Sequence, residues 1–202
     1  EMQHRVANSL QIIASILLMK ARTVTSEETR GHLQDAHKRV LSVAAVQQHL
    51  HATVGVEAIE LRPYLTQLSA SLAGSMIGDN SLIVIEALID EGRANSSEAV
   101  SLGLIVTELV INALKHAFPE EVPGCKIVGA YKKNGDDWQL SVSDNGKGKA
   151  ADAWPQARGG LGTSIVASLA KHLGAQVETV SGASGTSVSI THAKFKAIPE
   201  AA

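Results

Sequence analysis

One segment of the sequence sets three polar side chains into an otherwise apolar helical pattern: it reads Glu108-Leu109-Val110-Ile111-Asn112-Ala113-Leu114-Lys115-His116. Glu108 and Asn112 are four residues apart and Lys115 follows three residues later, so a helix places all three on one face. Burying them is costly unless a partner compensates. A divalent cation and a polyphosphate are suitable partners, because Asn112 offers a hard oxygen to Mg²⁺ and Lys115 a point charge to phosphate.

Two glycine-containing segments further along the chain add chemistry suited to a nucleotide. Asp144-Asn145-Gly146-Lys147-Gly148 stands where a predicted strand ends. There the carboxylate can accept a hydrogen bond from an exocyclic amine, and the glycines let the backbone approach a flat ring. Gly159-Gly160-Leu161-Gly162-Thr163-Ser164 opens a predicted helix, whose free N–H groups and dipole favour an anion. Each segment alone is common in turns, but their order and context together favour a nucleotide site.

The pattern around these segments predicts a two-layer α/β sandwich for the second part of the chain. We expect helices at 61–73, 98–117 and 161–173, and strands at 81–89, 126–133, 138–143, 176–181 and 186–192. Asn134-Gly135-Asp136 suits a hairpin turn with positive φ. The sequence contains neither a P-loop nor a dinucleotide-binding glycine fingerprint.

The first part of the chain predicts a helical hairpin. Apolar residues recur at helical spacing over 3–19, and Ser26 is a suitable N-cap for a second helix whose stripe continues to Leu50. Both helices carry a wide apolar face, so we expect a second copy to complete a four-helix bundle. Because the pattern breaks near Gly55, we predict two domains, a dimerisation hairpin at 1–57 and the α/β domain at 58–202.

Composition narrows the classes of function. The 202 residues include 45% apolar and 19% charged side chains, which is enough for a buried core. A net charge of −2 and 3% aromatic residues argue against nucleic-acid binding. The single cysteine, Cys125, fits a reducing cytoplasmic setting, and the apolar runs at 82–89 and 103–114 are short for a membrane span. A start in mid-helix, without Met, suggests a fragment of a longer protein.

The three polar and glycine-rich segments resemble the ATP-binding domain of the GHKL superfamily, which includes gyrase, Hsp90, histidine kinases and MutL. Residues 108–116 correspond to its N box, 144–148 to its first glycine box and 160–162 to its second, and Gly185-Thr186 resembles its closing motif. The first helix, Glu1-Met2-Gln3-His4-Arg5-Val6-Ala7-Asn8-Ser9-Leu10, resembles the phosphoacceptor helix of HisKA_2 and HWE sensor histidine kinases. No Trp-x-Glu lies near the glycine box, which favours HisKA_2.

This resemblance implies a helical hairpin followed by a Bergerat-type sandwich, and an enzyme that binds Mg-ATP and autophosphorylates His4. The phosphoryl group would pass to an aspartate on a response-regulator receiver domain, and a sensor domain would lie upstream. Asp144 would bind the adenine amine, and Asn112 would ligate Mg²⁺ with help from Glu108. The other implied nucleotide contacts are Lys115, His116, Gly146, Gly148, Gly160, Leu161, Gly162 and Thr186. For His116, capping of the helix end is the alternative.

Several roles and functions stay open at this point. Glu1 is a candidate to orient His4, because Arg5 stands where many histidine kinases have an acid, and Glu108 is the alternative. Asn8 either positions a water for dephosphorylation of the regulator or is a solvated helix residue. Alternative functions are an ATP-independent histidine phosphotransfer module and an enzyme acting mainly as a response-regulator phosphatase. A serine kinase or anti-sigma protein of the same superfamily would lack the His4 hairpin.

Overall fold

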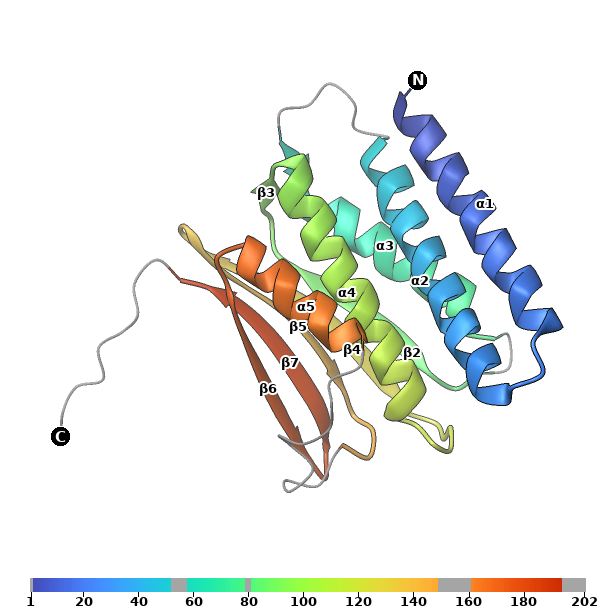
Figure 1. The fold of residues 1–202 in the computed structure, drawn as a ribbon. Helices are drawn as coiled ribbons and strands as arrows, with labels where there is room; N and C mark the ends of the chain where they lie inside the picture. Colours follow the sequence, from blue (N-terminus) through green and yellow to red (C-terminus); the bar gives the residue numbers. More distant parts are fainter. Residues whose placement is uncertain (1, 52–57, 79–80, 149–160, 194–202) are drawn as a thin grey trace.

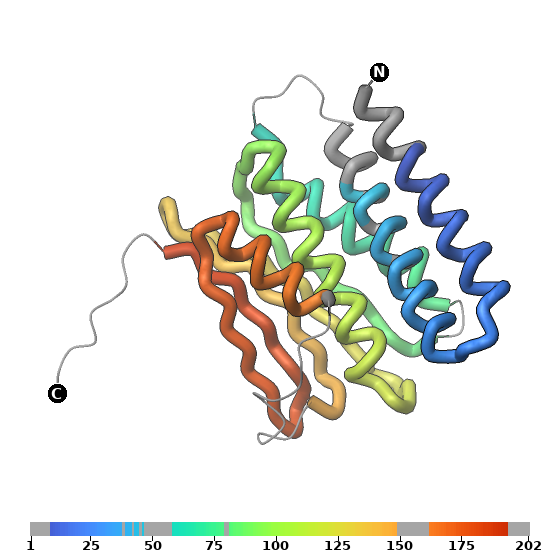
Figure 2. The backbone as a smooth tube through the Cα atoms, viewed as in Figure 1, coloured from blue at the N-terminus to red at the C-terminus, as the bar shows by residue number. Residues whose placement is uncertain are grey.

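The computed structural model describes residues 2–51, 58–78, 81–148 and 161–193 (Figures 1 and 2). The side chains at 2–8, 38, 42, 45, 47–51 and 161 are outside the description. Two helices, α1 (Met2–Thr23) and α2 (Glu27–His51), lie side by side as an antiparallel hairpin. They precede a five-stranded sheet with three helices, which confirms the predicted fold class. The domain boundary at residues 57/58 stays a prediction.

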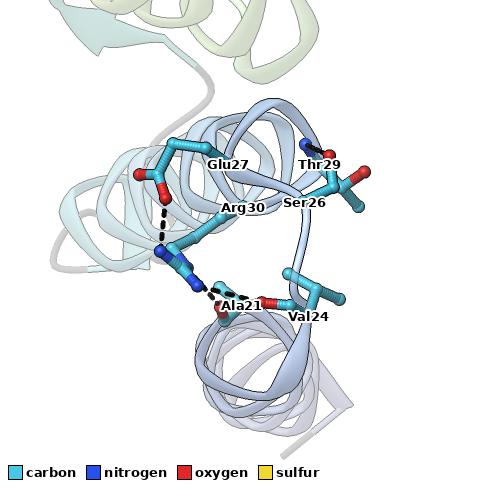
Figure 3. Close-up of polar contacts among 6 residues, drawn as sticks. All are labelled: Ala21, Val24, Ser26, Glu27, Thr29 and Arg30. Carbon is cyan, nitrogen blue, oxygen red and sulfur yellow. Dashed lines mark hydrogen bonds and ion pairs between the residues drawn. The ribbon is translucent and has the colours of Figure 1, made fainter.

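The turn between α1 and α2 is held by local polar contacts (Figure 3). Ser26 Oγ accepts a hydrogen bond of 3.2 Å from the backbone N–H of Thr29, as expected of an N-cap. Arg30 reaches back across the turn, donating from Nε to the Ala21 carbonyl at 3.3 Å and from Nη2 to the Val24 carbonyl at 3.0 Å. Arg30 also pairs with Glu27. These contacts fix the angle at which α2 leaves α1.

The main sheet has the order β2-β4-β5-β7-β6, from β2 (Val84–Ile89), β4 (Lys126–Asn134), β5 (Asp137–Asp144), β7 (Gly185–His192) and β6 (Gln176–Gly182). β2 pairs with β4 in parallel, and the other neighbours are antiparallel. Gly135 has φ +61° in the turn between β4 and β5, as predicted. The sheet is therefore mixed, with two crossover connections, one from β2 to β4 and one from β5 to β6.

Two features of the strands differ from the expectation. Residues 81–83 precede β2 instead of belonging to it, because Glu121 accepts hydrogen bonds from the hydroxyl of Ser81 and the backbone N–H of Leu82. A small second sheet pairs β1 (Ile59–Glu60) with β3 (Arg93–Ala94). A strand of two residues is too short to show the alternation of apolar and polar residues by which strands are predicted from a sequence.

Three helices cover one face of the main sheet: α3 (Leu61–Met76), α4 (Ser96–His116) and α5 (Leu161–His172) (Figure 1). α4 starts two residues earlier than expected, because Asn95 forms a capping box with Glu98. Among the described residues, α4 alone has the length and composition of a membrane span, but 67% of its most apolar window is buried. The core around it is closed by large aliphatic side chains, among them Leu65, Leu68, Ile105, Ile127, Leu140 and Ile190.

The hairpin has two different sides. Val46 of α2 is fully buried in the common core, where it faces Gly103 of α4. The other side exposes large apolar side chains on α1, namely Ile12, Ile13, Ile16 and Met19. Figure 1 shows α2 lying between α1 and α4. Dimerisation through the exposed side stays a prediction.

Candidate functional site

The carboxylate of Asp144 lies where β5 ends beside the start of β7. Its Oδ1 accepts hydrogen bonds from the backbone N–H groups of Gly146 at 3.0 Å and Thr186 at 3.3 Å. Among the described residues, none donates to Oδ2. Backbone donors therefore hold the carboxylate by one oxygen and leave the other to accept from a ligand.

Glycines are required around this carboxylate. Gly148 and Gly185 have φ values of +58° and +118°, a region that side-chain-bearing residues rarely adopt. A Cβ on Gly185 would overlap the Asp144 carbonyl, and one on Gly146 would lie 2.6 Å from the Cβ of Ala117. The loop is thus pressed against the end of α4. We name this group, comprising Asp144, Gly146, Gly148, Gly185 and Thr186, the Asp144 end of the site.

The second group lies on the face of α4 that meets the start of α5, and we name Glu108, Asn112, Lys115 and Gly162 the Glu108 end. Glu108 is 5% exposed, and its buried Oε2 has no hydrogen-bond partner among the described residues. A Cβ on Gly162 would lie 2.5 Å from that Oε2 and 3.6 Å from Asn112 Oδ1. Glycine therefore lets the start of α5 approach the two α4 side chains closely.

Burial dominates the electrostatics of Glu108. Loss of hydration raises the pKa of the Glu108 carboxyl above its ordinary value. The positive charges of Arg39 and Lys115 act in the opposite direction and lower it, whereas Asp35 raises it. A buried carboxylate with one unpaired oxygen favours a cationic partner.

Two residues of this region were missed by the sequence analysis, Arg39 and Asp35 of α2. Arg39 Nε lies 3.3 Å from Glu108 Oε1, and Asp35 forms an ion pair with Lys115. Their spacing of four residues places them on one face of α2. This face lies beside the apolar stripe of α2. That position beside the stripe is the one feature of the sequence that could have indicated Asp35 and Arg39 as contacts of the site.

Of the other predicted site residues, two adjoin the Glu108 end in the chain, and the rest lie on α1 or outside the described residues. His4 and Asn8 belong to α1, and their side chains are not described. His116 is in the last turn of α4, and Leu161 starts α5. Glu1 and Gly160 lie outside the described residues. The roles assigned to all of these residues therefore stay predictions.

The donor set of the Glu108 end fits Mg²⁺. Glu108 and Asn112 present hard oxygen atoms on one helix face, and Glu108 Oε2 is buried without a partner. Within the described part of the chain, no three His, Cys, Asp or Glu side chains gather as a metal site. A magnesium ion here would complete its coordination with water and phosphate oxygens, as this ion commonly does.

Comparison with known families covers most of the chain. Residues 1–76 match the HisKA_2 family, described as histidine kinase. Residues 97–196 match HATPase_c, described as the histidine kinase-, DNA gyrase B- and HSP90-like ATPase. The first match runs through α1, α2, β1 and α3, and the second takes in nearly all of α4 and the chain from β4 to β7, so β2 and β3 fall between the two.

Individual relatives agree with the family matches. Blue-light-activated histidine kinase 2 of Erythrobacter litoralis is 28% identical over 94% of this chain and 55% of the relative. Sensor histidine kinase PdtaS of Mycolicibacterium smegmatis is 30% identical over 84% of this chain and 34% of the relative. The chain thus spans about half, or a third, of the length of these relatives.

A solved structure has the same arrangement. The histidine kinase domain of the Erythrobacter litoralis EL346 blue-light-activated histidine kinase superposes with a TM-score of 0.68 at 27% identity. The match covers 94% of this chain and 87% of the solved one. Its two family matches and its arrangement of hairpin and mixed sheet therefore place the chain in the histidine kinase family, with a HisKA_2 region followed by a HATPase_c domain.

Proposed function

We propose that this chain binds Mg-ATP between the Asp144 end and the Glu108 end, phosphorylates His4, and passes the phosphoryl group to an aspartate of a response-regulator receiver domain. The observation that carries the proposal is a pair of carboxylates that each keep one oxygen available to a ligand. Asp144 Oδ2 and Glu108 Oε2 lack partners among the described residues, at opposite ends of one helix-and-loop arrangement. One suits an amine and the other a cation.

At the Asp144 end, the carboxylate accepts a hydrogen bond from the adenine amine, while Gly146 and Gly148 let the backbone approach the ring. Two backbone N–H donors already fix Asp144, so little side-chain freedom is lost when a ligand binds. Thr186 takes part through its N–H bond to that carboxylate. This end thereby selects the base of the nucleotide.

At the Glu108 end, Asn112 and Glu108 hold Mg²⁺, and Lys115, with His116 beside it, attracts the phosphates. The free N–H groups at the start of α5, which begins at Leu161, would add donors for an anion, and the resemblance assigns Gly160 to the same role. When bound, the metal would neutralise charge on the phosphate oxygens. Phosphoryl transfer depends mainly on such positioning and charge neutralisation.

The transfer itself uses an imidazole nitrogen of His4 as the nucleophile. It forms a bond to the γ-phosphorus, the bond to the β–γ bridging oxygen breaks, and ADP leaves with that electron pair. The ring proton passes to a carboxylate, for which Glu108 and Glu1 are the two candidates. A neutral imidazole is available for this step near pH 7. Asn8 would position a water when the regulator is dephosphorylated.

The domain division and the partners belong to the same proposal. Residues 1–57 would carry the phosphorylated histidine and dimerise, and 58–202 would bind ATP. The exposed apolar side chains of α1 support a second copy as the cover of the hairpin. A sensor domain would belong to the full-length protein, since the relatives are longer than this chain.

The test is incubation with γ-labelled ATP and Mg²⁺, followed by acid and base treatment of the labelled protein. Label that is lost in acid but kept in base identifies phosphohistidine. His4→Ala should lose the label while still binding a non-hydrolysable ATP analogue in calorimetry. His32→Ala is the matched control, because this histidine of α2 is exposed. Label retained in His4→Ala would overturn the assignment. Absence of any nucleotide binding would favour an ATP-independent phosphotransfer module.

A further inference from the structure

The face of α2 with Asp35 and Arg39 is matched in charge to the Glu108 end. α2 and α4 run antiparallel along three contacts, Asp35 with Lys115, Arg39 with Glu108, and Val46 with Gly103. The side chain of Arg39 is 18% exposed, and the side chain of Glu108 beside it is 6% exposed. Both charged groups that would serve Mg-ATP, Glu108 and Lys115, are therefore already paired with side chains of the histidine-bearing hairpin.

The order of these charges matches that of the proposed ligand. Mg-ATP would bring a cation to Glu108 and an anion to Lys115. α2 brings the cation of Arg39 to Glu108 and the anion of Asp35 to Lys115. Arg39 also reaches the start of α5, where a Cβ on Gly162 would lie 3.0 Å from its Nη2. The Arg39 side chain thus meets both Glu108 of α4 and the first turn of α5 at Gly162.

From this match we infer that α2 is an internal competitor of the nucleotide, with Arg39 standing in for the metal and Asp35 for a phosphate at the Glu108 end. The inference rests on the proposed function, whose site it regulates. Lys115 has one ammonium, and the buried Glu108 carboxylate gains little from two cations at once. Binding of the nucleotide and docking of α2 on α4 therefore oppose each other. By linkage, each weakens the other by the same factor.

Competition has a consequence for the hairpin. α2 lies between α1 and α4 (Figure 1), so α1, which carries His4, has no direct access to α4 while α2 is docked. Nucleotide binding displaces Asp35 and Arg39 and leaves the docking of α2 to apolar contacts such as Val46. The hairpin is then free to move relative to the bound phosphates. Binding of Mg-ATP would therefore also free α1, the helix that carries His4.

The primary test is the affinity of the chain for a non-hydrolysable ATP analogue with Mg²⁺, measured by calorimetry. Asp35→Asn removes the competing anion and keeps the shape, so we expect roughly fivefold tighter binding or more. Arg39→Gln should also tighten binding. The matched controls are Glu28→Gln on α2, whose side chain is 87% exposed, and Arg22→Gln on α1, which is exposed too. Both controls should retain the affinity of the unchanged chain.

A second measurement uses the unchanged chain and needs no variant to fold. A carbodiimide joins a carboxylate to an amine only when the two are in contact, so it should link Asp35 to Lys115. Peptide mapping should show this amide in the absence of nucleotide, and a saturating Mg-bound analogue should suppress it. The competition is overturned if the yield does not change under saturation, or if Asp35→Asn binds the analogue no more tightly.

The two proposals fail in different ways. If the unchanged chain binds the analogue and Asp35→Asn does so with the same affinity, the competition is wrong and the nucleotide site stands. If neither the unchanged chain nor any variant binds it, both proposals are wrong. The ion pairs would then serve only to join the two parts of the chain.

Discussion

The two ends of the proposed site are built in different ways. The Asp144 end is assembled from its own loop and strands, with backbone N–H groups on the carboxylate and glycines at the close contacts. The Glu108 end is completed by side chains from another part of the chain, Arg39 and Asp35. A side chain held by nearby backbone groups keeps its position when the surrounding elements move. Ion pairs between α2 and α4, in contrast, break when the two helices separate. One end is suited to constant recognition and the other to control.

The strongest test of this contrast is Gly185→Ala. The change forces a side chain into a backbone with φ +118° and into the Asp144 carbonyl. We expect the free energy of unfolding to fall by about 3 kcal/mol or more, since strain and overpacking add. Urea unfolding measures the loss. Gly182→Ala is the control, because a Cβ there meets nothing within 4 Å. Equal stability of the two variants would contradict a rigid Asp144 end.

Next in size is the effect of Asp144→Asn on nucleotide choice. An amide can no longer offer a second carboxylate oxygen to an amine, so affinity for the ATP analogue should fall about tenfold to a hundredfold. Calorimetry with the adenine nucleotide and with inosine triphosphate, which lacks the amine, measures the discrimination. The unchanged chain should prefer adenine, and the variant should lose most of this preference. A preserved preference would assign base recognition to another residue.

Val46→Ala examines the apolar part of the junction between α2 and α4. Val46 is fully buried against Gly103, and its truncation should lower the free energy of unfolding by about 1–2 kcal/mol. The Asp144 end lies elsewhere, so affinity for the ATP analogue should not fall. Urea unfolding and calorimetry on the same sample provide both readings. A loss of affinity would show that the Glu108 end needs α2 for its shape.

The smallest expected effect concerns the charge of Glu108. Burial raises the pKa of the Glu108 carboxyl, so the folded chain binds the carboxyl proton more tightly than the unfolded chain does. As pH rises and this proton is lost, the free energy of unfolding therefore falls. Glu108→Gln avoids that cost. At pH 7 it should be more stable than the unchanged chain, with the difference shrinking as pH falls towards 4.5. A loss of stability at pH 7 would mean that attraction to Arg39 outweighs burial.

Local patterns in the sequence predicted most of the fold. The cap at Ser26, the positive φ at Gly135 and the long periodic helix around Glu108 each depend on a few neighbouring residues, and the structure confirms all three. For the site, the spacing of Glu108 and Asn112 correctly placed both on one face of α4.

Features that depend on distant partners could not be predicted in the same way. Arg39 and Asp35 have the appearance of solvated helix residues, and only the docking of α2 on α4 gives them partners. The pairing of β1 with β3 joins segments more than thirty residues apart through two residues each. The parallel pairing of β2 with β4 likewise has no local signal, since strand direction is set by the crossover between them.

The parallel pairing of β2 with β4 also constrains how the protein folds. α4 is the crossover between these strands, so the helix that carries Glu108 and Asn112 packs against a sheet whose second strand is made later. Pairings between distant segments form slowly. The Asp144 end includes Gly185 and Thr186 of β7, so during synthesis it cannot form until the chain has been made as far as β7, well after α4. The hairpin is made before α4, and it can cover the face of α4 with Glu108 and Lys115 before the sheet is complete.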